Sequence, residues 1–440
     1  MPEVKFIDLF AGIGGLRLGF EQAFNKAGFE TKCMMTSEIK PHALKTLHHN
    51  FSHDYFVGDI TKVKNHEIPD FDFLLGGFPC QPFSAGGKRQ GFVDTRGTLF
   101  FEIERILESK KPYGFILENV EGLVRHDLEN KKDKIGRTLK TIIFKLEGLG
   151  YKVTTKVLNS ADFGLPQSRK RIFIVGALND HVNLDGFEPR YTAIKSILEK
   201  GLPTIDSKFT KLLLSHFSIE ELYGKSIKDK RGGDNNIHSW DIELKGPISK
   251  DQGNLLNMLF KQRRKKKWAG EIGIDWMDGM PLTLDQIKTF FDHKELENML
   301  DDLVKKNYLK FEYPKSLVTE LTLLGEKKYR VENRKLKPGY NIVAGKLSYA
   351  INKILDPNGI APTLVATDMA RLVVPDNGGV RSMTLREGLR LFGFPEWFEI
   401  PVSLDEGFDL LGNTVAVNVV EGVCSRSAAL FSYECVMPTG

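Results

Sequence analysis

Apolar residues in the first 180 positions alternate between short continuous runs and stripes with helical spacing. In one stripe, Leu16, Phe20, Ala23 and Phe24 recur every three or four residues and fall on one helical face. Stripes of this kind predict helices at 16–26, 41–50, 99–107 and 136–149. The continuous runs predict strands at 4–9, 31–36, 71–75, 115–117, 152–158 and 171–175. Such alternation predicts an α/β fold with a doubly wound, mostly parallel sheet.

The regular alternation stops after Leu178. The following segments are irregular and charged, with frequent glycine and proline and a basic run, KQRRKKKW, at 261–268. Helical spacing returns at 284–306, for one or two helices, at 384–392, and after the turn at 412. We therefore expect a first domain at 1–178, a second, irregular domain at 179–405 and a segment at 406–440 that returns to the first.

Composition narrows the classes of protein only a little. A chain of 440 residues that is 41% hydrophobic suits two globular domains. It has no long apolar run and no basic-then-apolar leader, so we expect neither a membrane span nor a secretory signal. Four scattered cysteines favour a reducing, cytoplasmic setting over a disulfide or zinc framework. The net charge of +5 permits a nucleic-acid partner without requiring one.

The first motif with chemical meaning is FIDLFAGIGG at 6–15, where a predicted strand ends in a glycine-rich turn. Glycines let a backbone approach a ligand closely, so this turn suits an adenosyl cofactor. The acids Glu38 and Asp59 follow the next predicted strands, where a carboxylate can bind ribose hydroxyls. A plain tight turn with two capping acids explains the pattern equally well. The turn is not GxGxxG, which disfavours a dinucleotide-dependent oxidoreductase.

A second motif, GGFPCQPFS at 76–84, places Cys80 between Pro79 and Pro82 after an apolar run. Prolines stiffen the backbone and would present the thiol outward. Most lone cysteines are buried core residues, but a core position does not need two flanking prolines.

Two polar motifs lie at the ends of predicted strands: ENV follows one strand and QSRKR precedes another. ENV at 118–120 puts Glu118 at a strand end, where an apolar setting would raise its pKa and make it a proton donor. The alternative is a helix start capped by Asn119. QSRKR at 167–171 contains Arg169 and Arg171, which suit a base or a phosphate, although a solvated basic turn is the alternative.

In this order the motifs resemble the DNA (cytosine-5)-methyltransferase family of bacterial restriction-modification systems. The resemblance covers the first 180 and the last 60 residues. It includes GDI at 58–60, DTRGTLF at 94–100, SMTLREGLRLFGFP at 382–395 and GNTVAVNVV at 412–420. It implies a Rossmann-like, S-adenosylmethionine-dependent methyltransferase domain, with a target recognition domain in the second part.

The resemblance assigns the catalytic roles. Cys80 matches the nucleophile that attacks C6 of cytosine, and Glu118 matches the residue that contacts the N3 and N4 edge. Arg169 and Arg171 match a pair of which one holds the base O2 and the other the Cys80 loop or a phosphate; we favour Arg171 for the base. The base that removes the C5 proton is not identified by the sequence.

The resemblance also implies a cofactor site without metal. Its expected residues are Phe10, Ala11, Gly12, Gly14, Gly15, Leu16, Glu38, Ile39, Asp59, Ile60, Pro79, Leu99, Asn413 and Val415.

The implied substrate is a cytosine flipped out of double-stranded DNA. Expected DNA contacts are Gln81, Ser84, Gln167, Arg263, Arg264, Lys265 and Thr363. For the basic run a solvated charged face is an equal alternative. We expect a monomer, with any cognate restriction endonuclease acting separately.

Two further hypotheses compete with this one. An RNA cytosine-5 methyltransferase on the same catalytic domain should have a smaller recognition region than this chain. A binding protein that had lost catalysis should lack Cys80 or Glu118, and both are present. The remaining cysteines, Cys33, Cys424 and Cys435, suit structural positions, and the histidines at 48, 49 and 53 suit the surface rather than a metal site.

Overall fold

The computed structural model divides into two compact units that alternate along the chain. Unit 1 comprises Met1–Lys200, Asp356–Ala370 and Met383–Gly440, and unit 2 comprises Gly201–Leu355 and Arg371–Ser382. The structure describes residues 1–52, 55–79, 98–128, 130, 132–229, 235–322, 325–343, 349, 351–364, 369 and 371–436. Each unit has its own apolar cores.

A seven-stranded sheet forms the centre of unit 1, with the order β3-β2-β1-β4-β5-β7-β6. The first five strands in this order are parallel, whereas β7 runs antiparallel to both β5 and β6. The expected doubly wound, mostly parallel sheet is therefore confirmed. The strands are β1 (Glu3–Leu9), β2 (Glu30–Ser37), β3 (Phe56–Val57), β4 (Phe73–Gly76), β5 (Gly114–Val120), β6 (Lys152–Asn159) and β7 (Lys170–Ala177).

Helices cover both faces of this sheet, as the two apolar cores of unit 1 show. On one face Phe20 and Phe24 of α1 and Val420 of α13 pack with Phe73 and Val175 of the strands. On the other face α3 and α4 supply residues such as Ile106 and Ile142. The helices of unit 1 are α1 (Gly15–Lys26), α2 (Pro41–Asn50), α3 (Thr98–Lys110), α4 (Arg137–Gly148), α11 (Leu385–Leu391), α12 (Leu404–Asn413) and α13 (Val417–Val436).

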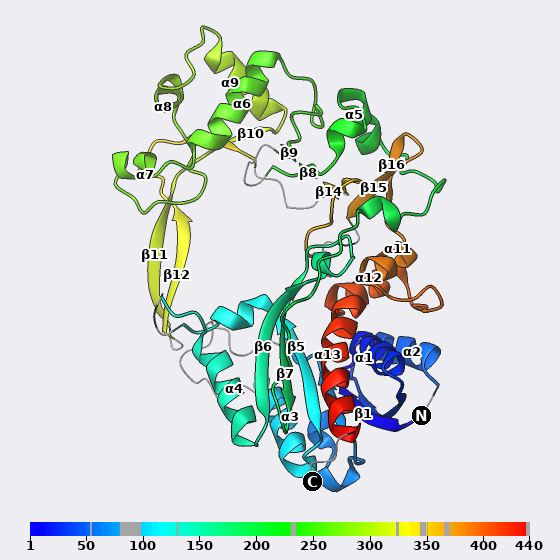
Figure 1. Cartoon of the computed structure of the whole chain (residues 1–440). Coiled ribbons are helices and arrows are strands. Elements are labelled where there is room, and N and C mark those ends of the chain that lie inside the picture. The colour runs from blue at the N-terminus through cyan, green and yellow to red at the C-terminus, as the bar shows by residue number, and fades with distance from the viewer. Residues whose placement is uncertain are drawn as a thin grey trace. The chain divides into compact units, whose positions relative to one another are not determined.

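Helices α1 and α13 lie side by side although some 400 positions separate them in the sequence (Figure 1). Their close approach depends on Gly19, because a Cβ there would lie only 2.6 Å from the Val420 side chain. The C-terminal segment thus completes the core of unit 1.

Unit 2 contains two smaller cores. One gathers Trp240, Trp268 and Tyr308 with the helices α6 and α9, and the other gathers Leu213 and Val373 with short strands. Its helices are α5 (Lys208–His216), α6 (Lys250–Gln262), α7 (Lys267–Glu271), α8 (Leu284–Lys288) and α9 (Leu296–Lys305). Its strands are β8 (Ser226–Ile227), β9 (Asn236–Ile237), β10 (Leu309–Glu312), β11 (Lys315–Thr322), β12 (Gly325–Glu332), β13 (Gly339–Ile342), β14 (Lys353–Ile354), β15 (Leu372–Asp376) and β16 (Gly379–Ser382).

The unit boundaries differ from those expected from the sequence. Residues 179–200, 356–370 and 383–405 belong to unit 1, not to the second domain. Glu199 shows why, since its backbone N–H donates to the Glu387 carboxylate at 2.8 Å and its own carboxylate accepts from the Thr384 hydroxyl at 2.6 Å. Among the described residues, no helix is both long and apolar enough to cross a membrane.

Candidate active site

The register of the parallel strands brings the sequence motifs to one edge of the sheet. Leu9 pairs with Ser37 and with Gly76, so β1, β2 and β4 end at the same level, and Gly76 pairs with Leu117 of β5, which continues to Val120. Glu38, which follows β2, and Glu118, which lies in the last residues of β5, are therefore both at the carboxyl edge, where α/β sheets bind ligands.

The turn after β1 has an unusual backbone. Phe10, Gly12 and Gly14 all have positive φ, of 58°, 58° and 83°. Gly14 requires glycine for a second reason, because a Cβ there would lie 2.6 Å from the Phe51 ring. The strained Phe10 conformation is held by this turn and places its ring at the pocket described below.

Glu38, just after β2, links the turns that follow two neighbouring strands. Its Oε2 accepts the Gly12 backbone N–H at 2.7 Å. Its Oε1 accepts the backbone N–H groups of Ile39 at 2.7 Å and Lys40 at 2.8 Å. Glu38 as a residue is 9% exposed, and three backbone donors hold its carboxylate at the edge of the pocket.

Asp59 lies after β3 and begins a short helical turn. Its carboxylate accepts from the Thr61 backbone N–H at 3.0 Å and from the Thr61 hydroxyl at 2.7 Å. The hydroxyl hydrogen bond is the main cause that lowers the pKa of Asp59, so this group is ionised at neutral pH.

A cavity of about 670 Å³ opens at this edge, a size typical of sites for small ligands. Nine of the expected cofactor residues line it: Phe10, Gly12, Glu38, Ile39, Asp59, Ile60, Pro79, Leu99 and Asn413. The catalytic candidates Glu118, Arg169 and Arg171 line the same cavity. One continuous space therefore joins the two expected sites.

Five expected cofactor residues do not line the cavity. Ala11, Gly14, Gly15, Leu16 and Val415 are buried or lie behind it. A Cβ on Gly15 would come within 2.8 Å of the Val415 side chain, so these two positions pack against each other. Their role in this structure is to fit α1 against the C-terminal segment.

Further lining residues were not expected from the sequence. Six of them lie inside recognised motifs, which was their only signal in the sequence: Gly58, Gly77, Phe78, Asn119, Val120 and Gly412. The other four, Ser37, Lys40, Ala43 and Leu410, lie outside those motifs.

Glu118 and Arg171 form an ion pair across two neighbouring strands. The Arg171 Nε atom lies 3.0 Å from the Glu118 Oε1 atom, and both side chains are mostly buried. The antiparallel pairing of β5 and β7 sets Val120 opposite Arg171 and so brings the two side chains together. Burial raises the pKa of Glu118, while the charges of Arg171 and Arg169 act against this rise.

Arg169 has a different environment. Its guanidinium donates to the carbonyl oxygens of Leu364 at 3.0 Å, Gly412 at 3.1 Å and Thr414 at 2.7 Å. Burial and the neighbouring Arg171 charge lower its pKa to about 9, so it remains protonated at neutral pH. Arg169 therefore binds the segments at 364 and 412–414 to the sheet edge, while its Nε atom has no hydrogen-bond partner among the described residues.

Asn119 fixes the end of β4. Its amide nitrogen donates to the Phe78 carbonyl at 2.9 Å, and its amide oxygen accepts the Val120 backbone N–H at 2.8 Å. Asn119 therefore does not cap the helical turn that follows, which was the alternative interpretation of ENV. Pro79 is the last described residue before the segment with Cys80, Gln81 and Ser84, which lies outside the described residues.

The comparisons with known proteins decide the family. The model of the C-5 cytosine-specific DNA methylase family matches residues 4–427. The chain belongs to this family. It is accordingly a cytosine-5 DNA methyltransferase, and the ion pair of Glu118 and Arg171 lies in the cavity of a methylase.

Named relatives of this methylase match it over nearly their whole length. "Type II methyltransferase M.NlaIV" of Neisseria lactamica is 57% identical over 97% of this chain and 99% of its own. "Type II methyltransferase M.NgoBV" of Neisseria gonorrhoeae is 55% identical over the same shares. Among solved structures, the Entamoeba histolytica methyltransferase EhMeth is 16% identical and has a TM-score of 0.51, over 97% of this chain and 98% of its own. This last likeness shows the shared fold.

Two residues expected to touch DNA, Gln167 and Thr363, make hydrogen bonds within unit 1 of the methylase. Gln167 is fully buried and its side chain bonds to the backbone of Leu391 and Leu364. The exposed Thr363 donates its hydroxyl to the Ser168 carbonyl at 2.6 Å. Gln167 is thereby corrected to a structural residue, since a fully buried amide cannot reach a phosphate.

The basic run in unit 2 divides in a similar way. Arg263 is 6% exposed and donates to the Asn341 side chain at 2.7 Å, which corrects its expected phosphate contact. Burial lowers its pKa to about 10. Arg264 pairs with Asp278 at 3.0 Å, whereas Lys265 is exposed. In the part of the chain that is described, no cluster of three or more His, Cys, Asp or Glu residues could hold a metal ion.

Proposed function

We propose that the protein transfers a methyl group from S-adenosylmethionine to C5 of a cytosine flipped out of a short duplex DNA sequence. The observation that carries this proposal is the single cavity lined both by Glu38 and Asp59 and by Glu118 and Arg171. A donor bound at one end would lie next to a base held at the other.

The cavity suits the proposed donor chemically. The carboxylates of Glu38 and Asp59 can accept hydrogen bonds from ribose hydroxyls and from an adenine amino group, and Ile39, Phe78 and Leu99 offer apolar contact. Glycines at 12 and 77 leave room for close backbone approach. S-adenosylmethionine supplies an electrophilic methyl group on a sulfonium sulfur.

The reaction follows from the poor nucleophilicity of cytosine C5. The Cys80 thiolate adds to C6 and forms an S–C6 bond, which makes C5 an enamine-like carbon that takes the methyl group. Glu118, whose pKa is raised by burial against the charges of Arg171 and Arg169, gives a proton to N3 from its protonated form and so neutralises the charge that develops on the ring. A base then removes the C5 proton, the C5–C6 double bond re-forms, the thiolate leaves and the N3 proton returns to Glu118.

Arg171 has two tasks in this scheme. It holds the Glu118 carboxyl at 3.0 Å, and its remaining donors can bind the cytosine O2. Arg169 keeps the walls at Gly412 and Thr414 in place through their carbonyls.

The biological setting is also a proposal. The Type II relatives support a modification enzyme that protects host DNA in a restriction-modification system, with a separate endonuclease. We assign sequence recognition to unit 2, which contains exposed basic residues such as Lys265. We further propose a cytoplasmic monomer.

A duplex library of random sequence tests the function. The purified protein is incubated with the library and S-adenosylmethionine, and bisulfite sequencing then finds protected cytosines. Protection in one recurring short motif is expected, and Cys80→Ser should abolish it while cofactor binding stays nearly intact. Methylation of transfer RNA alone, or activity of Cys80→Ser near that of the wild type, would contradict the proposal.

A further inference from the structure

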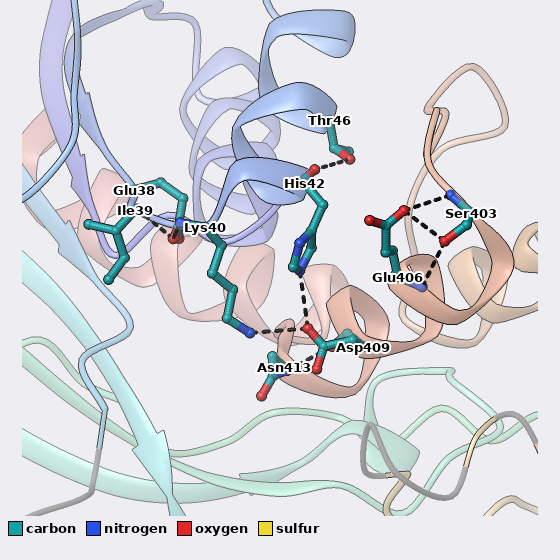
Figure 2. Close-up of polar contacts among 9 residues, drawn as sticks. All are labelled: Glu38, Ile39, Lys40, His42, Thr46, Ser403, Glu406, Asp409 and Asn413. Atoms are coloured by element: carbon teal, nitrogen blue, oxygen red, sulfur yellow. Dashed lines mark hydrogen bonds and ion pairs between the residues drawn. The ribbon is translucent and has the colours of Figure 1, made fainter.

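A polar cluster borders one side of the cavity, and of its four residues only Asn413 was expected at the cofactor site. Lys40 and His42 come from the start of α2, and Asp409 and Asn413 come from the end of α12 (Figure 2). All four belong to unit 1. Lys40, Leu410, Gly412 and Asn413 line the cavity, so the cluster joins two of its walls.

Asp409 is the centre of this cluster. Its Oδ2 accepts from the Lys40 Nζ at 3.1 Å and lies 3.2 Å from the His42 Nε2. The Asn413 amide nitrogen donates to the Asp409 carbonyl at 2.7 Å and to its Oδ1 at 3.2 Å. The Asp409 carboxylate thus contacts Lys40 and His42 from the start of α2 and Asn413 from the end of α12.

The cluster continues into the glycine-rich turn. The Lys40 backbone N–H is bound by Glu38, and the other oxygen of Glu38 binds the Gly12 backbone N–H. A chain of hydrogen bonds therefore runs from Gly12 through Glu38 and Lys40 to Asp409 and Asn413. It follows the rim of the cavity, and Asp409 is its only carboxylate on the C-terminal segment.

The charge of Asp409 is maintained although it is partly shielded from water. Burial acts to raise the pKa of Asp409, but the hydrogen bonds and charges of Lys40 and His42 outweigh burial and lower it. Asp409 is 40% exposed, and exposed ion pairs contribute little to folding stability. The Asp409 carboxylate should thus affect the positions of the residues that line the cavity more than the free energy of unfolding.

We infer that Asp409 is a positioning residue for the methyl donor, which holds Lys40 and Asn413 at the rim of the cofactor cavity. This inference rests on the proposed function, because it takes the cavity as the donor site. Asp409 itself does not line the cavity. Without its carboxylate, the Lys40 ammonium loses its acceptor and the Asn413 amide keeps only its bond to the Asp409 carbonyl. Lys40 above all must then be ordered anew when the donor binds.

The test compares Asp409→Asn with Glu406→Gln on the same helix. Glu406 lies one turn earlier, accepts from Ser403 and does not line the cavity (Figure 2). Glutamine also serves at this capping position, so the control keeps the helix start. Calorimetry with S-adenosylmethionine and steady-state kinetics on substrate DNA give the affinity, KM and kcat.

We expect Asp409→Asn to raise the dissociation constant and the KM for S-adenosylmethionine about tenfold, as for the loss of charge-assisted hydrogen bonds. The kcat, the KM for DNA and the melting temperature without cofactor should change little, and Glu406→Gln should match the wild type. Lys40→Met provides a second variant that weakens donor binding. In its background the effect of Asp409→Asn should shrink, because the two residues act through one contact.

The outcomes separate the two proposals. If the wild type does not bind S-adenosylmethionine, the proposed function fails. If the wild type binds it and Asp409→Asn binds equally well, or loses kcat rather than affinity, the positioning role is wrong. Independent, additive effects of Lys40→Met and Asp409→Asn would also overturn it.

Discussion

Two buried carboxyl groups, Asp8 and Glu118, lie on parallel strands of unit 1 in different surroundings. Glu118 faces Arg171 in the cavity, whereas neither carboxyl oxygen of Asp8 has a hydrogen-bond partner among the described residues. Burial is the main cause that raises the pKa of both groups. At the residue scale, we therefore expect Glu118 to make kcat depend on pH and Asp8 to make the free energy of unfolding depend on pH.

Replacing Glu118 by glutamine should separate catalysis from binding. Glutamine keeps the shape and one hydrogen bond but cannot give a proton to cytosine N3, so we expect kcat to fall by about 10²–10⁴. Affinity for DNA should change much less. In the wild type, kcat should decline as the pH rises through the raised pKa of Glu118, and the variant should lack this decline. Equal losses of kcat and DNA affinity would reduce Glu118 to a binding residue.

Asp8 should make the wild type less stable in alkali. Its pKa of about 8 in the folded state exceeds the usual value near 4, so the folded state binds more protons between these pH values. The free energy of unfolding then falls as pH rises from about 4 to about 8 and levels off above it. Asp8→Asn cannot ionise, and urea unfolding at pH 5, 7 and 9 should show a weaker decline for it. Parallel declines would mean that Asp8 is not the group responsible.

At the scale of elements, the contact between α1 and α13 depends on a position without a side chain. A Cβ at Gly19 would lie 2.6 Å from two carbons of Val420 and 2.9 Å from the Glu421 nitrogen. Gly19→Ala should therefore lower the free energy of unfolding by about 1–3 kcal/mol through overpacking. The control is the exposed Gly148 of α4, where a Cβ would meet nothing within 4 Å. Gly148→Ala should leave the free energy of unfolding unchanged or raise it. Thermal unfolding of both variants and of the wild type measures these differences.

The sequence predicted elements well where local signals were strong. The helix expected at 41–50 is α2 at Pro41–Asn50, because proline at its start and apolar spacing mark it clearly. The strand β3 was expected only as the strand before Asp59, without bounds, since two residues carry no periodicity. The antiparallel direction of β7 was also hidden, because pairing with β5 and β6 is a long-range property.

The same limit applies within the site. Glu38, Asp59 and Glu118 were found because each follows a predicted strand. Arg169 and Arg171 look equivalent in QSRKR, yet one binds three carbonyls and the other pairs with Glu118. Asp409 carried no signal, because its partners Lys40 and His42 lie 369 and 367 positions away.

At the scale of the whole molecule, unit 1 is built from three separate stretches of chain. Ending the chain at residue 416 would remove α13 and expose its contacts with α1, Phe73 and Val175. We expect this truncated protein to be insoluble or to lose near-ultraviolet circular dichroism. The control replaces the exposed ribbon of β11 and β12 in unit 2 by a short turn. This variant should keep a folded unit 1 that binds S-adenosylmethionine, and a soluble, cofactor-binding truncation would contradict the prediction.

The packing of α13 on α1 also has a consequence for synthesis in the cell. Ribosomes release chains amino end first, so α1 emerges roughly 390 residues before α13, about 20–80 seconds at ~5–20 residues per second. During that interval the side of α1 that packs on α13 is uncovered and can bind a chaperone. A nascent chain also has no complete methyl-donor cavity, because the wall at 410–413 is translated late. Chromosomal DNA thus meets a competent enzyme only after nearly the whole chain has been made.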